Sequence, residues 1–184
     1  MKLIAIVGMT GAGKSELAKL FEKKGYANIR FGDITEEILK KKGLDINEEN
    51  EKSVRNSLRK EYGMEAYAKA NLEKVEQALK AGNVVIDGLY SWEEFVFLKQ
   101  KFKDLIVLAV YSPPEMRYDR LVDREVRSLT KEQARKRDKD ELENLNKAAP
   151  IAMANYTMVN VGTLFDLEEK FNSFMEWMKE EGEK

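Results

Sequence analysis

The chain has 184 residues, 43% hydrophobic and 35% charged, with a formal net charge of −1 and neither cysteine nor histidine. These absences exclude a disulfide framework, a thiolate nucleophile, a Ser-His-Asp triad and Cys or His metal ligands. The balanced charge disfavours a generally basic nucleic-acid-binding protein, and no apolar run approaches the roughly 20 residues of a membrane span. We therefore expect a folded cytoplasmic protein whose catalysis would use carboxylates, Lys, Arg, hydroxyls, backbone amides or a bound metal.

Short apolar runs typical of buried parallel strands occur three times. The run 3–7 ends directly at a glycine, and the others cover residues 84–86 and 105–110. Weaker strand patterns cover residues 28–31 and 156–159. Helical patterns separate these strands, and this alternation predicts an α/β fold with a parallel sheet that is covered by helices on both faces.

Helices are indicated by apolar residues spaced three or four positions apart. One such stripe follows the first strand at residues 17–21, and a short helix is expected from Ile34 to Lys42, closed by Gly43. Further stripes cover residues 64–79, 95–102 and 164–178. We assign these stripes to the hydrophobic core and expect no chemistry from them.

Two segments carry too few apolar side chains to belong to the core. Residues 45–63 are polar with a helical pattern, in which Arg55 and Arg59 lie one turn apart on the same face. Residues 117–137 contain six arginines, at positions 117, 120, 124, 127, 135 and 137. No repeat, proline-rich linker or low-complexity tract divides the chain, so we expect a single domain.

Residues 8–15 read GMTGAGKS and match the pattern G-x-x-x-x-G-K-[ST] between an expected strand and an expected helix. Glycines let successive N–H groups point into one concavity, which binds phosphate oxygens together with the helix N-terminus. Lys14 is expected to reach the β- and γ-phosphates, and the Ser15 hydroxyl to bind Mg²⁺. ATP and Mg²⁺ are thus the expected cofactors, and the residues expected to contact the nucleotide are Gly8, Thr10, Gly11, Ala12, Gly13, Lys14 and Ser15.

Two aspartates are expected at the edge of the sheet where parallel strands place their ligands. Asp87 directly follows the run 84–86, and it either holds the Mg²⁺ shell or caps the turn before Gly88. Asp33 follows the expected strand 28–31 and is a candidate to accept a proton from an acceptor hydroxyl, to bind a ribose, or to cap the next helix. Because the chain has no imidazole, a carboxylate is the expected base.

The arginines at 117, 120, 124 and 127 recur every three or four residues, so one helix would place them along one side. On a solvated helix they would pair with acidic neighbours such as Asp119 and Asp123. A guanidinium group, however, matches phosphate oxygens better than an ammonium group does. We expect at least two of these arginines to bind phosphate.

The residues together resemble the nucleoside monophosphate kinase superfamily of P-loop proteins, and most closely its dephospho-CoA kinase-like and archaeal adenylate kinase-related members. The resemblance spans nearly the whole chain and is carried by the P-loop, Gly32-Asp33, Asp87-Gly88, Arg120 with Arg124, and residues 160–163. It implies a three-layer P-loop NTPase fold with a five-stranded parallel sheet, an acceptor-binding helical insert at residues 45–63 and a LID at residues 124–145.

The resemblance also implies roles for particular residues. Arg120 and Arg124 match arginines that clamp the donor and transferring phosphates as the LID closes. Arg137 and Asp138 match a second LID pair, and Asn160 lies in a loop near the donor adenine.

The chain departs from adenylate kinases at two places. Glu36 stands where those enzymes tend to have an arginine, so an acceptor phosphate would bind Arg55, Arg59 or Arg30 instead. The Pro-Arg that often follows the Asp-Gly pair is also absent, since residues 89–92 read LYSW. Both departures argue against an adenylate kinase proper.

We expect ATP-dependent phosphoryl transfer to a small nucleotide-like acceptor, of the nucleotide or dephospho-CoA type. The residues expected to act are Lys14, Asp33, Arg120 and Arg124 in catalysis, Asp33, Arg55, Arg59 and Asp87 in acceptor binding, and Ser15 and Asp87 in metal binding. The alternative is a P-loop ATPase or nucleotide switch that acts on a protein or RNA partner. For the kinase we expect a monomer or weak homo-oligomer, with neither a membrane nor nucleic acid as partner.

Overall fold

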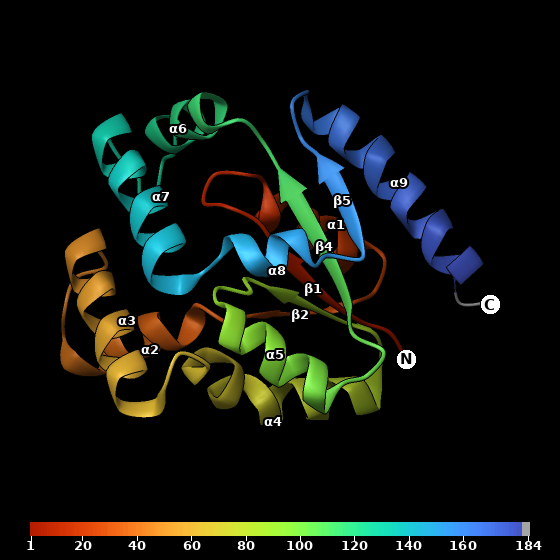
Figure 1. Cartoon of the computed structure of the whole chain (residues 1–184), viewed down its shortest axis with the longest axis horizontal. Helices are drawn as coiled ribbons and strands as arrows, with labels where there is room; N and C mark the ends of the chain where they lie inside the picture. Colours follow the sequence, from red (N-terminus) through yellow and green to blue (C-terminus); the bar gives the residue numbers. More distant parts are fainter. Residues whose placement is uncertain (182–184) are drawn as a thin grey trace.

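A single five-stranded sheet forms the centre of the computed structural model, which describes residues 1–181 (Figure 1). The strands are β1 (Leu3–Val7), β2 (Ala27–Arg30), β3 (Val84–Asp87), β4 (Ile106–Tyr111) and β5 (Tyr156–Val159). All neighbours pair in parallel, in the order β2-β3-β1-β4-β5. The prediction of a five-stranded parallel sheet is confirmed.

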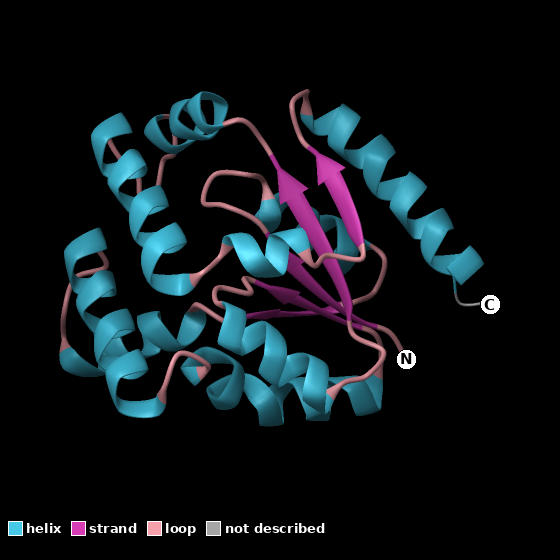
Figure 2. Cartoon of the chain, viewed as in Figure 1, coloured by secondary structure: helices cyan, strands magenta, loops and turns pink. Residues whose placement is uncertain are grey.

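Helices cover both faces of this sheet, as Figure 2 shows. They are α1 (Lys14–Lys23), α2 (Asp33–Lys42), α3 (Glu48–Tyr62), α4 (Ala66–Ala81), α5 (Trp92–Lys101), α6 (Pro114–Val122), α7 (Lys131–Leu145), α8 (Ala148–Ala152) and α9 (Leu164–Glu181). The three-layer arrangement expected from the alternation of strands and helices is confirmed as well.

Alternate residues of β1 belong to two separate cores, because successive side chains of a strand point to opposite faces. Leu3, Ala5 and Val7 pack in a core with side chains of α4 and α5. Ile4 and Ile6 pack in a second core with side chains of α1 and α9. The strand is therefore buried on both faces, which explains why its sequence is continuously apolar.

The expectation that one helix carries the arginines at 117, 120, 124 and 127 is wrong. Helix α6 ends at Val122, and the chain then turns so that Leu129 donates its backbone N–H to the Leu121 carbonyl (3.0 Å). Leu121 and Leu129 share a small core between α6 and α7. Burial of these two side chains ends the helix, so Arg124 and Arg127 lie in the connecting segment.

Candidate active site

Residues 8–13 of the GxxxxGKS motif form a loop between β1 and α1 at the carboxyl edge of the sheet, and Lys14 and Ser15 begin α1 (Figure 1). Gly13 has a φ of 107°, and a Cβ atom there would collide with the side-chain amide of Asn160. A Cβ atom on Gly8 would collide with the Val110 carbonyl oxygen. The two positions therefore require glycine because the loop packs tightly against neighbouring chain segments.

The N-terminus of α1 faces this loop without a side-chain cap. The first N–H groups of a helix have no partner within it, so they bind anions readily. Lys14 is the first residue of α1, and its ammonium group donates to the Gly8 and Met9 carbonyl oxygens at 2.9 and 3.1 Å. Burial, together with the nearby charge of Lys147, lowers the pKa of Lys14 to about 7. The loop thus holds its own lysine with carbonyl groups that a phosphate can replace.

Ser15 and Asp87 meet beside the loop. The Ser15 hydroxyl donates to Asp87 Oδ2 at 3.2 Å, and Asp87 is buried at the end of β3. Within residues 1–181 no cluster of three or more acidic, His or Cys residues is arranged to hold a metal ion. A hydroxyl and one carboxylate fit Mg²⁺, which usually takes its other ligands from water and from substrate phosphates.

A cavity of about 660 Å³ opens beside the loop. Its walls come from the P-loop, the ends of β2 and β3, α3, the start of α4 and the segment from Arg124 to Leu145. Nine cationic and five carboxylate side chains line it. Because the cations are in excess, the cavity favours an anionic ligand.

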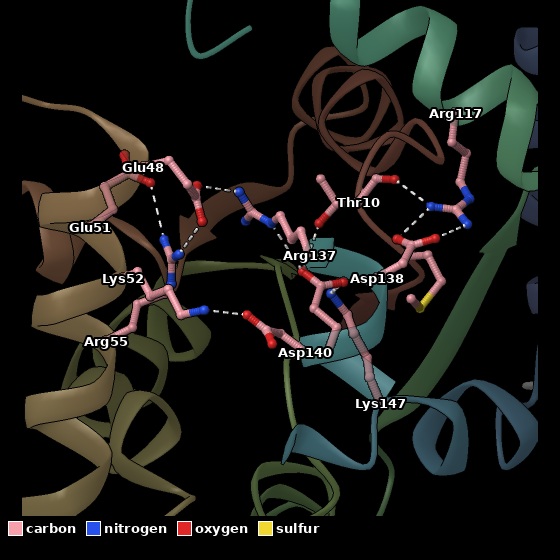
Figure 3. A network of polar contacts seen from close by, with 12 residues as sticks. Thr10, Glu48, Glu51, Lys52, Arg55, Arg117, Arg137, Asp138, Asp140 and Lys147 are labelled. Atoms are coloured by element: carbon pink, nitrogen blue, oxygen red, sulfur yellow. Dashed lines mark hydrogen bonds and ion pairs between the residues drawn. The ribbon is translucent and has the colours of Figure 1, made fainter. Parts of the chain in front are cut away.

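Ion pairs connect α3 and α7 across this cavity (Figure 3). Arg137 of α7 pairs with Glu48 of α3 at 2.8 Å, and Glu48 also pairs with Arg55 at 2.7 Å. Lys52 of α3 pairs with Asp140 of α7. The two helices, which come from the expected insert and the expected LID, are thereby held on opposite sides of one cavity.

Arg124 lines the cavity without a carboxylate partner in the part of the chain that the structure describes. Burial and the charges of Arg137, Arg127 and Arg30 lower the pKa of its guanidinium group. Four arginines thus repel one another at this place. Such a cluster is suited to phosphate, which accepts several charge-assisted hydrogen bonds at once.

Arg55 and Arg59 both line the cavity, but their surroundings differ. Arg55 pairs with Glu48 at 2.7 Å and Glu51 at 3.1 Å. The Arg59 guanidinium lies 5.3 Å from the centre of the Tyr67 ring, and its Nε is buried without a hydrogen-bond partner. Of the two, Arg59 has the greater unused capacity to bind an anion.

Asp33 does not line the cavity, although its neighbours Gly32 and Thr35 do. Gly32 is the N-cap of α2 and no side chain caps the helix, so the alternative of Asp33 as a helix cap is wrong. The Asp33 side chain is half exposed and lies 3.4 Å from Arg30. Desolvation nevertheless raises the pKa of its carboxyl group.

Arg120 and Asn160 also lie outside the cavity lining, next to another part of the P-loop. The Asn160 side-chain amide donates to the Ala12 carbonyl oxygen at 2.9 Å. Arg120 donates to the Asn160 carbonyl oxygen at 3.2 Å and to the Ser112 hydroxyl at 2.9 Å. The structure therefore separates Arg120 from Arg124 and places it against the loop that carries Asn160.

Several residues support the P-loop from the protein interior. Arg117, one of the four arginines considered for phosphate binding, is buried, pairs with Asp138 and donates to the Thr10 carbonyl oxygen at 2.9 Å, so its guanidinium group is occupied by the protein. Glu141 and Lys147 were not expected from the sequence to belong to the site. Glu141 accepts a hydrogen bond from the Thr10 hydroxyl, and Lys147 pairs with Glu141. The only sequence signal for Glu141 is its position three residues after Asp138, on the same face of a helix.

Known proteins resemble this chain in sequence and in fold. The profile of a family described as AAA domain matches residues 4–146. The chain is 36% identical to a UPF0200 protein of Thermococcus kodakarensis over 95% of this chain and 96% of that protein. It is 37% identical to a UPF0200 protein of Sulfurisphaera tokodaii over 92% of this chain and 93% of that protein.

Two solved kinase structures have similar folds. A shikimate kinase of Bacteroides thetaiotaomicron has a TM-score of 0.65 at 15% identity and covers 97% of this chain and 98% of its own. A gluconokinase of Sinorhizobium meliloti has a TM-score of 0.64 at 15% identity, with coverages of 98% and 94%. Fold and sequence motif thus define a P-loop protein, and its fold is the one found in these two kinases. Within that class, the chain belongs to the AAA domain family and to the UPF0200 proteins.

The described helices were also compared with the requirements of a membrane span. In residues 1–181 none of them is both long enough and apolar enough to cross a bilayer.

Proposed function

We propose that the protein is a Mg²⁺·ATP-dependent kinase that phosphorylates a small nucleotide-like acceptor. The cavity beside the P-loop carries this proposal, because its lining includes Lys14 and Ser15 together with an excess of cations. An anionic acceptor bound there lies next to a phosphate held by the loop. Enclosure between α3 and α7 would limit the access of water, which competes with an acceptor for the phosphoryl group.

The chain offers groups for each requirement of phosphoryl transfer, which are chiefly positioning and positive charge. Lys14 and Arg124 would place positive charge around the transferring phosphate, and Ser15 and Asp87 would hold Mg²⁺. When bound, the metal would neutralise phosphate charge. Arg120 would contact the donor from the other part of the loop, because it lies outside the acceptor cavity.

The acceptor is proposed to be nucleotide-like for two reasons. Arg59 and Arg124 offer guanidinium groups without carboxylate partners in the described chain, which suits a phosphate on the acceptor. Tyr67 and Tyr90 add aromatic side chains to the same lining, and these can pack against a planar base. Residues 45–63 and 124–145 would act as the acceptor insert and the LID.

Two carboxylates are candidates to orient or deprotonate the acceptor hydroxyl. Asp87 lines the cavity, whereas Asp33 lies beside the cavity residue Arg30. Asp33→Asn tests the second candidate. If Asp33 is the base, the rate of phosphoryl transfer should fall steeply in this variant while its affinity for Mg²⁺·ATP is retained. An equal loss of rate and affinity would indicate that Asp33 is a structural or metal-binding residue.

The proposal is tested with radiolabelled ATP, Mg²⁺ and a panel of nucleosides, nucleotides and dephospho-CoA. Label on an acceptor, absent with Lys14→Ala, supports the kinase. Release of phosphate without an acceptor would instead identify an ATPase or switch. If the wild-type protein formed neither a labelled acceptor nor free phosphate, both enzymatic functions would be overturned.

A further inference from the structure

The buried face of α7 is unusual because it carries charged residues. Ala134, Asp138 and Glu141 are its buried residues. Asp138 pairs with Arg117, which donates to the Thr10 carbonyl oxygen at 2.9 Å. Glu141 accepts a hydrogen bond from the Thr10 hydroxyl at 2.7 Å. Helix α7 therefore contacts Thr10 directly through Glu141 and indirectly through Asp138, which holds Arg117.

The Glu141 carboxylate connects three parts of the molecule. Its Oε1 accepts from the Thr10 hydroxyl of the P-loop and from Arg137 Nε, at 2.7 and 3.3 Å. Its Oε2 accepts from the Lys147 ammonium group at 2.8 Å. Thr10, Arg137 and Glu141 line the cavity, so this carboxylate fixes the P-loop and a cavity arginine at the same time.

Lys147 is fully buried, which is rare for a lysine. Besides Glu141, its ammonium group lies 5.4 Å from the centre of the Tyr90 ring. A buried ion pair often stabilises a fold no better than an apolar pair of the same size, because both charges lose their hydration. Stability alone therefore does not explain why a lysine occupies this position.

The charge of Lys147 has a different consequence. A carboxylate beside the P-loop would repel the phosphates that the loop binds, unless a cation neutralises it. Arg137 cannot fill that role alone, because it is shared with Glu48. Lys147 supplies this cation and binds Oε2 of Glu141, so that Oε1 remains available to Thr10 and Arg137.

We propose that Glu141 and Lys147 are positioning residues for phosphate binding: Glu141 fixes Thr10 and Arg137 relative to each other, and Lys147 neutralises that carboxylate. The inference rests on the proposed nucleotide site. Burial alone would raise the pKa of Glu141, but the charges of Lys147, Arg137 and Lys14 hold it below the usual range. Glu141 thus stays ionised, as an anchor requires, and is too weak a base to deprotonate an acceptor.

The first test compares Glu141→Gln, Lys147→Met and the double variant with wild type. Each single variant leaves one buried charge without its partner and is expected to unfold at a lower temperature, whereas the double variant removes both charges and regains most of that loss. The double variant should nevertheless bind Mg²⁺·ATP about tenfold more weakly, since Arg137 loses its charged anchor. Lys139→Met/Glu143→Gln is the matched control, because it removes an exposed ion pair from the same helix.

A second measurement separates positioning from a purely structural role. Thr10→Val removes the hydroxyl group that donates to Glu141. If Glu141 supports phosphate binding by fixing Thr10, the losses of Mg²⁺·ATP affinity in Thr10→Val and in Glu141→Gln should not add in the variant that combines them. A purely structural role of Glu141 would give additive losses.

The outcomes distinguish the inference from the proposed function. Wild-type affinity in the Glu141→Gln/Lys147→Met variant, or additive losses when Thr10→Val and Glu141→Gln are combined, would overturn the positioning role alone. A wild-type protein that binds Mg²⁺·ATP but labels no acceptor would overturn the kinase alone. A wild-type protein without Mg²⁺·ATP binding would overturn both.

Discussion

Lys14 combines two properties that conflict in the free protein. It is half-buried near Lys147, yet its proposed role in phosphate binding requires a positive charge. The carbonyl oxygens of Gly8 and Met9 stabilise the ammonium group only in part, because its pKa is still lowered to about 7. A bound phosphate adds negative charge beside it and therefore favours the protonated form.

We expect Mg²⁺·ATP binding above pH 7 to be accompanied by proton uptake at Lys14. The free lysine is mostly neutral there and becomes charged in the complex, so affinity should fall by up to about tenfold per pH unit above pH 7. Titration calorimetry in buffers of different ionisation enthalpy measures the uptake. ATP itself is fully ionised at pH 8, where the comparison with Lys14→Met isolates the lysine. Equal uptake by this variant would contradict the assignment.

Arg124 is expected to contribute to phosphate binding and not to folding. Arg124→Met should lower kcat/KM for phosphoryl transfer about 10- to 100-fold, which is the effect of losing one hydrogen bond between charged groups. Its thermal stability should be unchanged or higher, since the substitution removes a cation that is repelled by Arg30, Arg127 and Arg137. Steady-state kinetics and thermal unfolding measure the two effects.

Arg135→Met is the matched control for this prediction. Arg135 belongs to the same arginine-rich segment but is exposed on α7, where it pairs with Glu115 at 3.1 Å. A loss of transfer in this variant that equals the loss in Arg124→Met would show that the segment acts through its overall charge.

The sequence predicted the site residues that belong to a contiguous pattern or follow a strand. The P-loop and Asp87 are of this kind, because the end of a parallel strand has a known place in the fold. Asp33 shows the limit: the helix was expected to begin at Ile34, but Asp33 is already its first residue, and Gly32 and Thr35 line the cavity while Asp33 does not. Lys147 could not be predicted, because its burial depends on tertiary packing.

At the scale of elements, ion pairs and few backbone contacts connect α3 with α7. Lys52 pairs with Asp140 and Glu48 with Arg137, across the cavity that an acceptor would occupy. The side chains of Lys52 and Asp140 are 44% and 37% exposed, so their pair contributes at most about 1 kcal/mol to stability. Loss of the Lys52–Asp140 ion pair should therefore change how often the cavity opens locally, with little change in the free energy of global unfolding.

Lys52→Met is expected to increase local opening of the cavity. Amide hydrogen exchange, followed by mass spectrometry, should become faster in α3 and α7 than in the wild-type protein, with little change in the unfolding temperature. Lys139→Met is the control, because Lys139 lies on α7 but pairs within that helix, with Glu143. Unchanged exchange in α3 would mean that other contacts keep the cavity closed.

Periodicity predicted the helices that pack on the sheet and the polar helix α3, but it failed for the arginine-rich residues 117–127. The stripes that became α4, α5 and α9 face an apolar core, so their spacing reflects their packing. The spacing of arginines in residues 117–127 has no such cause, and the chain leaves the helix at Val122 to bury Leu129. The five residues of α8 are too few to show a helical period.

At the scale of the whole molecule, one buried acid couples stability to pH. Glu94 is fully buried in α5 and accepts a hydrogen bond from the Tyr90 N–H at 2.8 Å, while its Oε1 has no partner. Burial raises the pKa of Glu94 to about 7, despite that hydrogen bond and the nearby charge of Arg59. The folded protein therefore binds a proton at Glu94 that the unfolded chain releases near pH 4.5.

Because the folded state binds the extra proton, the contribution of Glu94 to stability is fully present below pH 4.5 and declines as the pH rises to about 7. The loss amounts to about 3 kcal/mol for the fully buried group, since each pKa unit corresponds to about 1.4 kcal/mol. Glu94→Gln stays neutral throughout, so it should match the wild-type protein near pH 4.5 and exceed it in unfolding free energy above pH 7. Urea unfolding at pH 5, 6, 7 and 8 measures the difference, with Glu93→Gln as the neighbouring control. If the difference in unfolding free energy between wild type and Glu94→Gln stayed constant across this range, Glu94 would already be ionised in the folded protein. In that case the nearby charges of Arg59 and Lys147 would stabilise its carboxylate, and Glu94 would belong to the charged network beside the cavity.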